Sequence, residues 1–371
     1  MAQVDSSPRK HGFLRKHAGR FGASVVLTVC VLWGLQHSGL KLVPPAAAFA
    51  GVRWWTVPVY LVLVIAMSYF RAVRWRFLLR KVGEVSASKI LSVSFVGFAA
   101  ILLLPFRLGE FVRPAMLREK GKISFSAVTG SIIAERIVDG LYLSVVLAIA
   151  LLAVPTIDPL PEKVVGLPVT VAQVRGYAFF TLAGFACALA TIAVYFFARG
   201  FARRATLAVF GLVSKKLAER LAHEAERLAD GLHVLQSPKD AWGFMLESTL
   251  YWGINAAGMW LLAWGCGLQH ADGSAITYWE ACSMMGMLGV TILIPGPPGL
   301  LGIFQAGMFC GMTMYFPATL VESRGAVYAC LLFGVQVTFT VVAGAIALLS
   351  GRGSLAQISE AEDDAAADPA G

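Results

Sequence analysis

The sequence of 371 residues is 57% hydrophobic and only 14% charged, and its mean hydropathy is strongly positive. This composition excludes a single water-soluble globule with a polar surface and predicts an all-α protein that crosses a membrane several times. The formal net charge is +9, but the basic residues cluster in connections beside apolar segments, where membrane topology and anionic lipid account for them without a nucleic-acid partner.

The basic N-terminal segment, residues 1–20, precedes an apolar run without a convincing small-residue cleavage site. We therefore expect a cytoplasmic N-terminus and a retained first span instead of a cleaved signal peptide. About 20 apolar residues cross the hydrocarbon core of a bilayer. The stretches that come close to this requirement are 23–43, 56–70, 137–155, 176–198, 241–264 and 327–349.

Two further apolar regions, 90–104 and 276–316, each run into a break rich in proline and glycine. Lysine and arginine, which mark the cytoplasmic side, are concentrated in the connections on both sides of the first region. A short apolar stretch that enters and leaves on one side must turn back, so we predict a re-entrant hairpin over 88–118. Each span moves the chain to the other side of the membrane. Following this alternation along the sequence makes 276–316 a second hairpin, which the chain enters from the outside.

The two halves of the chain then share one order, two spans, a hairpin and a span, in opposite orientations, with both termini in the cytoplasm. We therefore predict an inverted-topology repeat, with units at 21–175 and 176–350 and with six full spans plus two hairpins. Eight full spans are the alternative, because 276–316 is long enough for two helices. The same Pro-x-x-x-Gly spacing recurs in both hairpins, at Pro105 and Gly109 and at Pro295 and Gly299.

A charged insertion, 199–240, interrupts the second unit. Its leucines fall on one face of a helix, opposite glutamate and arginine side chains: Leu217, Leu221, Leu228, Leu232 and Leu235. This pattern predicts an amphipathic helix on the cytoplasmic surface, and a solvated connector helix without a role in transport is the alternative. The end of the chain, 351–371, is acidic and rich in alanine, so we expect a disordered tail.

The first hairpin carries charges where lipid is expected, in the stretch LLPFRLGEFVRPAML. A charged side chain at the centre of a membrane-spanning helix costs at least ~2.5–3.5 kcal/mol, so such groups persist only with partners or water. Glu110 lies three residues after Arg107 and three before Arg113, so one carboxylate is within reach of both arginines. Pro105 and Gly109 break the helix here and free backbone groups, which predicts a wet cavity and a substrate site.

The AERIVDG motif places Glu135 and Asp139 one helical turn apart, with Arg136 at the side. Two carboxylates on one face at the mouth of a span can share a proton or pair with Arg107 or Arg113. The alternative is that these residues snorkel to the cytoplasmic interface.

The second hairpin contains the uncharged break LIPGPPGLLGIFQAG. Its prolines and glycines predict a rigid tip without helix, whose exposed amides can meet an anion. A tight turn between two ordinary spans is the alternative. The tip residues are Pro295, Gly296, Pro297, Pro298, Gly299, Gly302 and Gln305.

Cysteine and histidine give no sign of catalytic or metal chemistry. The six cysteines stand singly in or beside apolar segments, and only His37 and His270 lie near span ends. We therefore expect packing roles for the cysteines, and no metal site, cofactor or Ser/His/Asp triad. The sequence also lacks a Walker motif for ATP.

Taken together, LLPFRLGEFVRPAML, AERIVDG and IPGPPGLLGIFQ resemble the flippase-like family named for the transmembrane region of lysylphosphatidylglycerol synthase, from about residue 20 to 350. The resemblance implies a membrane domain that moves charged or glycosylated lipids between leaflets. It matches Pro105, Arg107, Gly109, Glu110 and Arg113 to the first motif, Glu135, Arg136 and Asp139 to the second, and Pro295, Gly299 and Gly302 to the third. Because the third motif often ends in glutamate, Gln305 makes proton coupling there doubtful. No synthase domain follows the last span, so we expect no lysyl-lipid synthesis.

We therefore expect a flippase, and not an enzyme, in the cytoplasmic or inner membrane, with a membrane lipid as its partner. It would move an anionic or glycosylated lipid, such as a phospholipid or polyprenyl phosphate, through a polar groove between the hairpins. Arg107 and Arg113 would hold the phosphate, Glu110 would orient them, and Glu135 and Asp139 would exchange protons or compete for the arginines. The alternatives are a membrane enzyme that modifies a lipid headgroup, with Glu135 or Asp139 as general base, and a secondary transporter of a small soluble anion.

Overall fold

The computed structural model describes residues 44–80, 82–104, 109–118, 123–157, 197–212, 214–232, 237–292 and 298–352, with scattered positions between 164 and 195. The predicted N-terminal segment and first span, part of the predicted span 176–198 and the acidic tail lie outside the described residues. Five predicted site residues also lie outside them: Pro105, Arg107, Pro295, Gly296 and Pro297.

The described chain is almost entirely helical, and an isolated β-bridge joins Gln269 and Ala275. The helices of the first half are η1 (Ala46–Gly51), α2 (Thr56–Val73), α3 (Trp75–Leu79), α4 (Ala87–Leu103), α5 (Val112–Leu117) and α6 (Phe125–Ala153). An insertion of α8 (Arg199–Gly211) and α9 (Lys215–Leu232) follows. The later helices are α10 (Pro238–Gly265), α11 (Tyr278–Ile292), η4 (Pro298–Leu300), α12 (Ile303–Thr313), α13 (Ala318–Leu320), η5 (Val321–Gly325), α14 (Ala326–Ala347) and η6 (Leu348–Arg352).

Three described segments are long and apolar enough to cross a membrane: Thr56–Leu79, Phe125–Ala153 and Ala318–Ser350. The helices α4 and α12 are apolar but shorter. These helices confirm the prediction of an α-helical, multi-pass membrane protein. They do not test which side of the membrane each end occupies, so the orientation stays a prediction.

Helix α6 begins well before the span that was predicted for it at 137–155. The Ser124 hydroxyl caps its first turn by accepting a hydrogen bond from the Ala127 amide, at 3.2 Å. The polar AERIVDG motif then lies inside the helix and not at its mouth, because its charged groups have partners on other helices. Hydropathy alone therefore placed the start of α6 too late.

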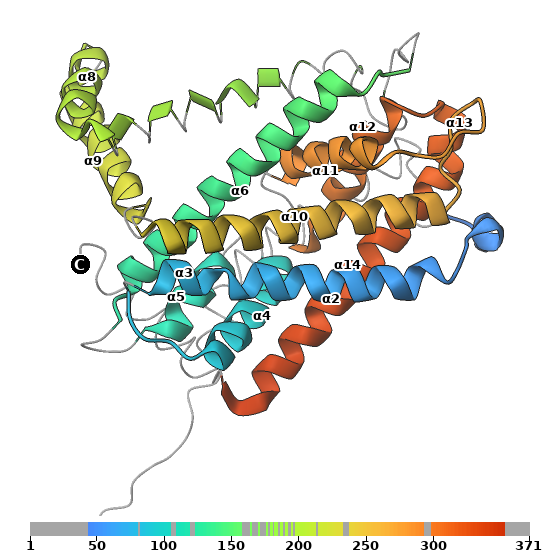
Figure 1. Ribbon diagram of the computed structural model, residues 1–371, viewed down its shortest axis with the longest axis horizontal. Coiled ribbons are helices and arrows are strands. Elements are labelled where there is room, and N and C mark those ends of the chain that lie inside the picture. The colour runs from blue at the N-terminus through green and yellow to red at the C-terminus, as the bar shows by residue number, and fades with distance from the viewer. Residues whose placement is uncertain are drawn as a thin grey trace, which may run out of the picture.

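Helix contacts in the first half have counterparts in the second half. Helices α2 and α10 lie side by side along the long axis of the molecule (Figure 1). Helix α4 packs against α14, and α11 packs against α6. Helix α4 also contacts α5 and α2, as α11 contacts α12 and α10. The main packing contacts are therefore reproduced when α2, α4, α5 and α6 are exchanged with α10, α11, α12 and α14, respectively.

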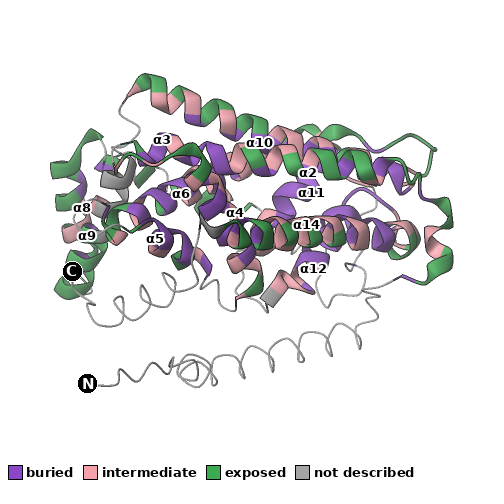
Figure 2. Cartoon of the chain, turned by 90° about the horizontal axis from the view of Figure 1, so that it is seen from below, coloured by how far each residue is buried: buried purple, intermediate pink, exposed green. Residues whose placement is uncertain are grey.

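The α11–α12 pair forms the most enclosed part of the bundle. Figure 2 shows buried residues gathered on these two helices, whereas α2 and α10 keep exposed outer faces. Glycines allow the close packing: a Cβ at Gly311 would lie 2.9 Å from the Met284 Cα, and one at Gly307 would lie 3.2 Å from the Leu288 Cα. Small residues four apart let membrane helices approach in this way.

A similar close contact occurs at Gly109, in the region predicted as the first hairpin. A Cβ there would lie 2.1 Å from the Ile101 backbone nitrogen and 2.2 Å from the Ala100 carbonyl carbon, so the chain after the break packs directly on α4. Backbone atoms of a helix cannot move aside as a flexible side chain can. Glycine is therefore required at this position for steric reasons.

We expect Gly109→Ala to destabilise the protein by about 1–3 kcal/mol, because the added methyl group forces α4 and the hairpin apart. The midpoint of thermal unfolding in detergent measures the effect. Gly130→Ala is the matched control, since nothing lies within 4 Å of a Cβ there and alanine favours the α6 helix by up to about 1 kcal/mol. Equal midpoints for the two variants would contradict the packing argument.

The insertion contains two helices where one was predicted. Helices α8 and α9 contact each other and stand at one end of the bundle, where α9 contacts α6 (Figure 1). Leu217 and Leu221, on the predicted apolar stripe of α9, are both exposed. An amphipathic helix therefore exists here, and its place on the cytoplasmic surface stays a prediction.

Candidate functional site

The centre of the site is Arg74, the first residue after α2, which is completely buried. Its two Nη atoms each donate to one oxygen of Asp139, both at 2.7 Å, so the pair is bidentate. The Nη2 atom also donates to Glu135 at 3.1 Å, and Nη1 to the Ser248 hydroxyl at 3.0 Å. Arg74 thus ties α6 and α10 to the end of α2 through charge-assisted hydrogen bonds.

Arg113 is the second buried arginine, and it also pairs with Glu135. Its Nη1 atom donates to Glu135 Oε2 at 2.9 Å, and its guanidinium lies 3.8 Å from the centre of the Trp75 ring. Gly97 makes room for its stem, because a Cβ there would lie 2.3 Å from the Arg113 Cγ. The spacing argument paired Arg113 with Glu110. In the structure Arg113 turns to Glu135 on α6 instead.

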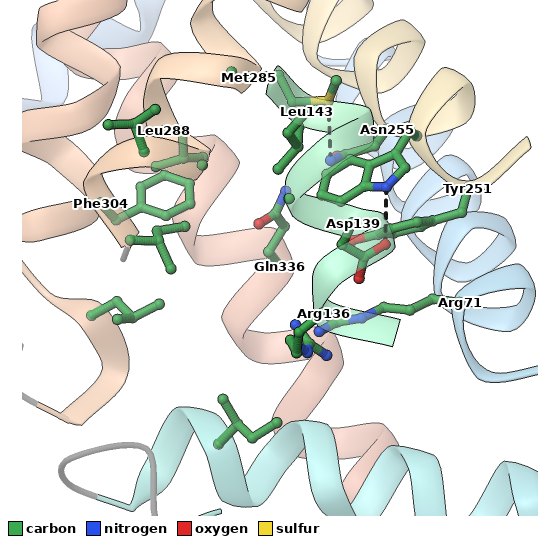
Figure 3. A pocket seen from close by; sticks show the side chains of 18 of the residues that line it. Arg71, Arg136, Asp139, Leu143, Tyr251, Asn255, Met285, Leu288, Phe304 and Gln336 are labelled. Atoms are coloured by element: carbon green, nitrogen blue, oxygen red, sulfur yellow. Dashed lines mark hydrogen bonds between the residues drawn. The ribbon is translucent and has the colours of Figure 1, made fainter. Parts of the chain in front are cut away.

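A cavity of about 660 Å³ lies beside this buried network and is lined by helices from both halves of the chain. Four charged groups line it: Arg71, Arg136, Asp139 and Glu110. Most of the remaining wall is apolar and includes Leu143, Leu288 and Phe304 (Figure 3). The cavity therefore has a few charged groups in an otherwise largely apolar wall.

Both regions that were predicted as hairpins contribute to this cavity. Ile101, Leu102 and Glu110 line it from the first hairpin, and Gly299 and Leu300 line it from the second. Helix α4 also contacts η4 directly. Described residues that follow the two predicted breaks thus line one cavity.

Arg71 and Arg136 point toward one another from α2 and α6 (Figure 3). The Arg71 guanidinium lies over the Phe98 ring, 4.1 Å from its centre, and within the described residues it has no carboxylate partner. Arg136 is 3.6 Å from Glu135. The Nε atoms of both arginines and Nη2 of Arg136 are buried without a hydrogen-bond acceptor. Unused donors on two facing guanidinium groups are suited to a phosphate or another multivalent anion.

The charges around the cavity do not balance. The described groups are Arg71, Arg74, Arg113, Arg136, Glu110, Glu135 and Asp139. Four positive minus three negative charges leave a surplus of one positive charge in a mostly apolar setting. Buried charge is costly unless it is paired, so this surplus favours an anionic ligand.

The second hairpin tip has unusual backbone geometry. Gly299 and Gly302 have φ angles of +75° and +86°, and Leu300 between them has φ of +55°, which is rare for a residue with a branched side chain. Gln305 is buried and its side-chain oxygen accepts a hydrogen bond from the Gly302 amide at 2.7 Å. Gln305 therefore stabilises the start of α12.

The structure divides the predicted site residues into two groups. Glu110, Arg136 and Asp139 face the cavity, whereas Glu135 and Arg113 lie behind it in the buried network. Of the described tip residues, Gly299 lines the cavity, and Pro298, Gly302 and Gln305 shape the tip.

Sequence reasoning missed Arg71 and Arg74. Both were assigned to a positive cytoplasmic connection, because they follow an apolar run. One pattern could have identified them: they are three residues apart, Phe70 and Trp75 flank them, and the helix needs no break to reach them. Among the described residues, no group of three or more His, Cys, Asp and Glu side chains could hold a metal ion.

Comparison with known proteins identifies one family. The family described as "Lysylphosphatidylglycerol synthase TM region" matches residues 21–344 of this chain. No curated protein and no solved structure matches the sequence of this chain.

Proposed function

Because the chain belongs to the family of lysylphosphatidylglycerol synthase transmembrane regions, we propose that it is a lipid flippase of the cytoplasmic or inner membrane. It moves an anionic or glycosylated lipid between leaflets and leaves the lipid chemically unchanged. One observation carries this proposal: a largely apolar cavity is lined by two facing arginines whose donors are not fully used. A lipid has this combination of an anionic headgroup and hydrocarbon chains.

In this proposal Arg71 and Arg136 hold the phosphate of the headgroup. Arg113 is completely buried against Glu135 and Trp75, so its role is to position the network instead of touching the substrate. Glu135 and Asp139 are both engaged by Arg74, and they orient the arginines instead of exchanging protons. Arg107 lies outside the described residues and remains a candidate for the same headgroup.

Acyl or isoprenyl chains would occupy the apolar body of the cavity, beside Leu143, Leu288 and Phe304 (Figure 3). The inverted repeat belongs to the same proposal. It is supported by the exchangeable contacts of α4 with α14 and of α11 with α6, and by the contact of α4 with η4. Two predicted hairpins whose described residues line one cavity would let the polar headgroup cross, while the chains follow in the apolar part of the same cavity.

Reconstituted vesicles test the proposal. We expect the protein to move a fluorescent anionic phospholipid between leaflets faster than empty vesicles do, and faster than it moves the same lipid with a choline headgroup. Mass spectrometry of the recovered lipid should show no change of mass, whereas a modified headgroup would indicate a membrane enzyme. Uptake of free phosphate without lipid movement would indicate a transporter of a small anion.

A variant that fills the apolar body gives a second test. Val337 lines the cavity from α14, so we expect Val337→Trp to slow lipid movement several-fold without removing any charge. Val342 is on the same helix and is 50% exposed, so Val342→Trp is the matched control and should transport like the unchanged protein. Equal rates for both variants would show that the lipid does not pass through this cavity.

A further inference from the structure

The insertion after the first half of the chain carries an exposed apolar stripe on α8. Phe201 and Val209 are 64% and 61% exposed, and Leu212, which continues α8 in helical geometry (φ −65°, ψ −30°), is 89% exposed. The spacing of these residues and of two alanines places them along one face of the helix. The α8 stripe consists of Phe201, Ala205, Ala208, Val209 and Leu212. The leucine stripe that was predicted from the sequence lies on α9, so the α8 stripe is a different surface.

A neighbouring face of α8 makes the contacts inside the insertion. Ala202 is buried against Tyr195, and the Tyr195 hydroxyl donates a hydrogen bond to the Thr206 hydroxyl at 2.6 Å. Ala202 and Thr206 are one helical turn apart, so they share this face. Helix α9 contacts α8 and has buried alanines of its own, Ala218 and Ala222. The helices therefore pack through small side chains, and the larger apolar side chains of the α8 stripe stay exposed.

Basic side chains accompany the α8 stripe. Residues 199–220 contain six lysine and arginine residues and one acidic residue, Glu219. Arg204 lies three residues after Phe201 and borders the α8 stripe. Apolar side chains bordered by arginine and lysine are typical of a helix that lies at the surface of an anionic membrane. The exposed basic residues are Arg199, Arg203, Arg204, Lys215, Lys216 and Arg220.

The direction of α8 fits the same surface. Helices α8 and α9 stand at one end of the bundle in both Figure 1 and Figure 2, and α8 runs across the direction of α2 and α10. Helix α2 belongs to a segment that is long and apolar enough to cross a membrane. Because membrane-spanning helices tilt only about 20° from the membrane normal on average, a helix that runs across α2 lies close to the membrane plane.

We propose that the α8 stripe inserts into the headgroup region of the membrane at this end of the bundle, and that the accompanying arginines and lysines bind anionic phospholipid there. An excess of six positive groups over one negative group matches a layer of many phosphates. This contact is separate from the cavity between the two halves, and it does not depend on lipid movement through that cavity.

Site-specific photo-crosslinking in nanodiscs tests the contact. The nanodiscs contain equal amounts of phosphatidylcholine and phosphatidylglycerol, and mass spectrometry identifies the crosslinked partner. We expect Phe201→benzoylphenylalanine to crosslink to lipid, with phosphatidylglycerol in several-fold excess over phosphatidylcholine. Phe210→benzoylphenylalanine is the matched control, because Phe210 is 42% exposed on the side of α8 away from Phe201. It should crosslink to little lipid.

Neutralising the two adjacent arginines separates the charge from the apolar stripe. Arg203→Gln combined with Arg204→Gln should lower the excess of phosphatidylglycerol at the Phe201 position. Crosslinks from this position to protein alone, or equal lipid crosslinking from both phenylalanine positions, would overturn the membrane contact. Lipid crosslinks without an excess of phosphatidylglycerol, or an excess that the arginine variant keeps, would overturn the preference for anionic lipid.

The result is independent of the transport proposal, because crosslinking measures contact and not lipid movement. The substituted side chains are exposed, so the variants should unfold at the same temperature as the unchanged protein. Normal transport without lipid crosslinks from the Phe201 position would leave the proposed function in place and remove the α8 contact. Lipid crosslinks from this position without transport would do the reverse.

Discussion

Replacing Glu135 by glutamine is expected to destabilise the protein by about 3–5 kcal/mol, which is the usual cost of leaving a buried ionic partner uncompensated. Glu135 is fully buried and accepts hydrogen bonds from Arg74 at 3.1 Å and from Arg113 at 2.9 Å. Arg74 keeps Asp139, but Arg113 loses the carboxylate that pairs with it and cannot reach water. The midpoint of thermal unfolding in detergent should fall sharply.

A partly exposed ion pair supplies the control for Glu135→Gln. Glu247 lies 2.5 Å from Arg76, whose side chain is 41% exposed, so Glu247→Gln should cost no more than about 1 kcal/mol. The double variant Glu135→Gln with Arg113→Met should lose less than the sum of the two single losses, because it removes both members of one pair. Strictly additive losses would mean that Arg113 and Glu135 do not stabilise one another.

The membrane helices could be predicted from sequence because the length of an apolar run is a local property. The prediction 241–264 differs from α10 by a few residues, and 327–349 agrees similarly with α14. The start of α6 was missed because it depends on distant residues. Hydropathy counts Glu135 and Asp139 as polar, although Arg74, far away in the chain, compensates both.

The members of the site could be predicted better than their roles. Buried charge pointed to Arg136, Asp139 and Glu110, which do face one cavity. The pairing did not follow from spacing, because Gly97 leaves room for Arg113 to reach α6. No local pattern in the sequence shows that a glycine on one helix clears the path for a side chain on another.

Arg71 and Arg74 show why position relative to an apolar run is a poor guide to role. Both follow the same run, and a rule for topology assigned both to the cytoplasm. In the structure α2 runs directly into α3 with a single residue between them, so the helix carries the two arginines into the bundle. Arg74 forms ion pairs there, and Arg71 faces the cavity. The first stabilises the fold, and in our proposal the second binds the substrate.

Replacing Arg71 by glutamine is expected to slow movement of an anionic lipid by about tenfold to a hundredfold. A hydrogen bond to a charged group contributes about 1.5–3 kcal/mol, and each 1.4 kcal/mol is a factor of about ten. The effect on stability should have the opposite sign. Arg71 has no carboxylate partner within the described residues and faces Arg136 (Figure 3), so removing its charge relieves repulsion and the unfolding midpoint should stay unchanged or rise.

This opposition between transport and stability distinguishes a ligand site from a structural one. Arg74→Gln should lower the unfolding midpoint, because Asp139 and Glu135 both lose the arginine that they share. Arg71→Lys keeps the charge but loses the planar fork, so intermediate transport is expected. Vesicle assays and thermal unfolding on the same preparations measure both quantities. If Arg71→Gln transported normally, or lost stability as Arg74→Gln does, Arg71 would belong to the scaffold and the headgroup would have to bind elsewhere.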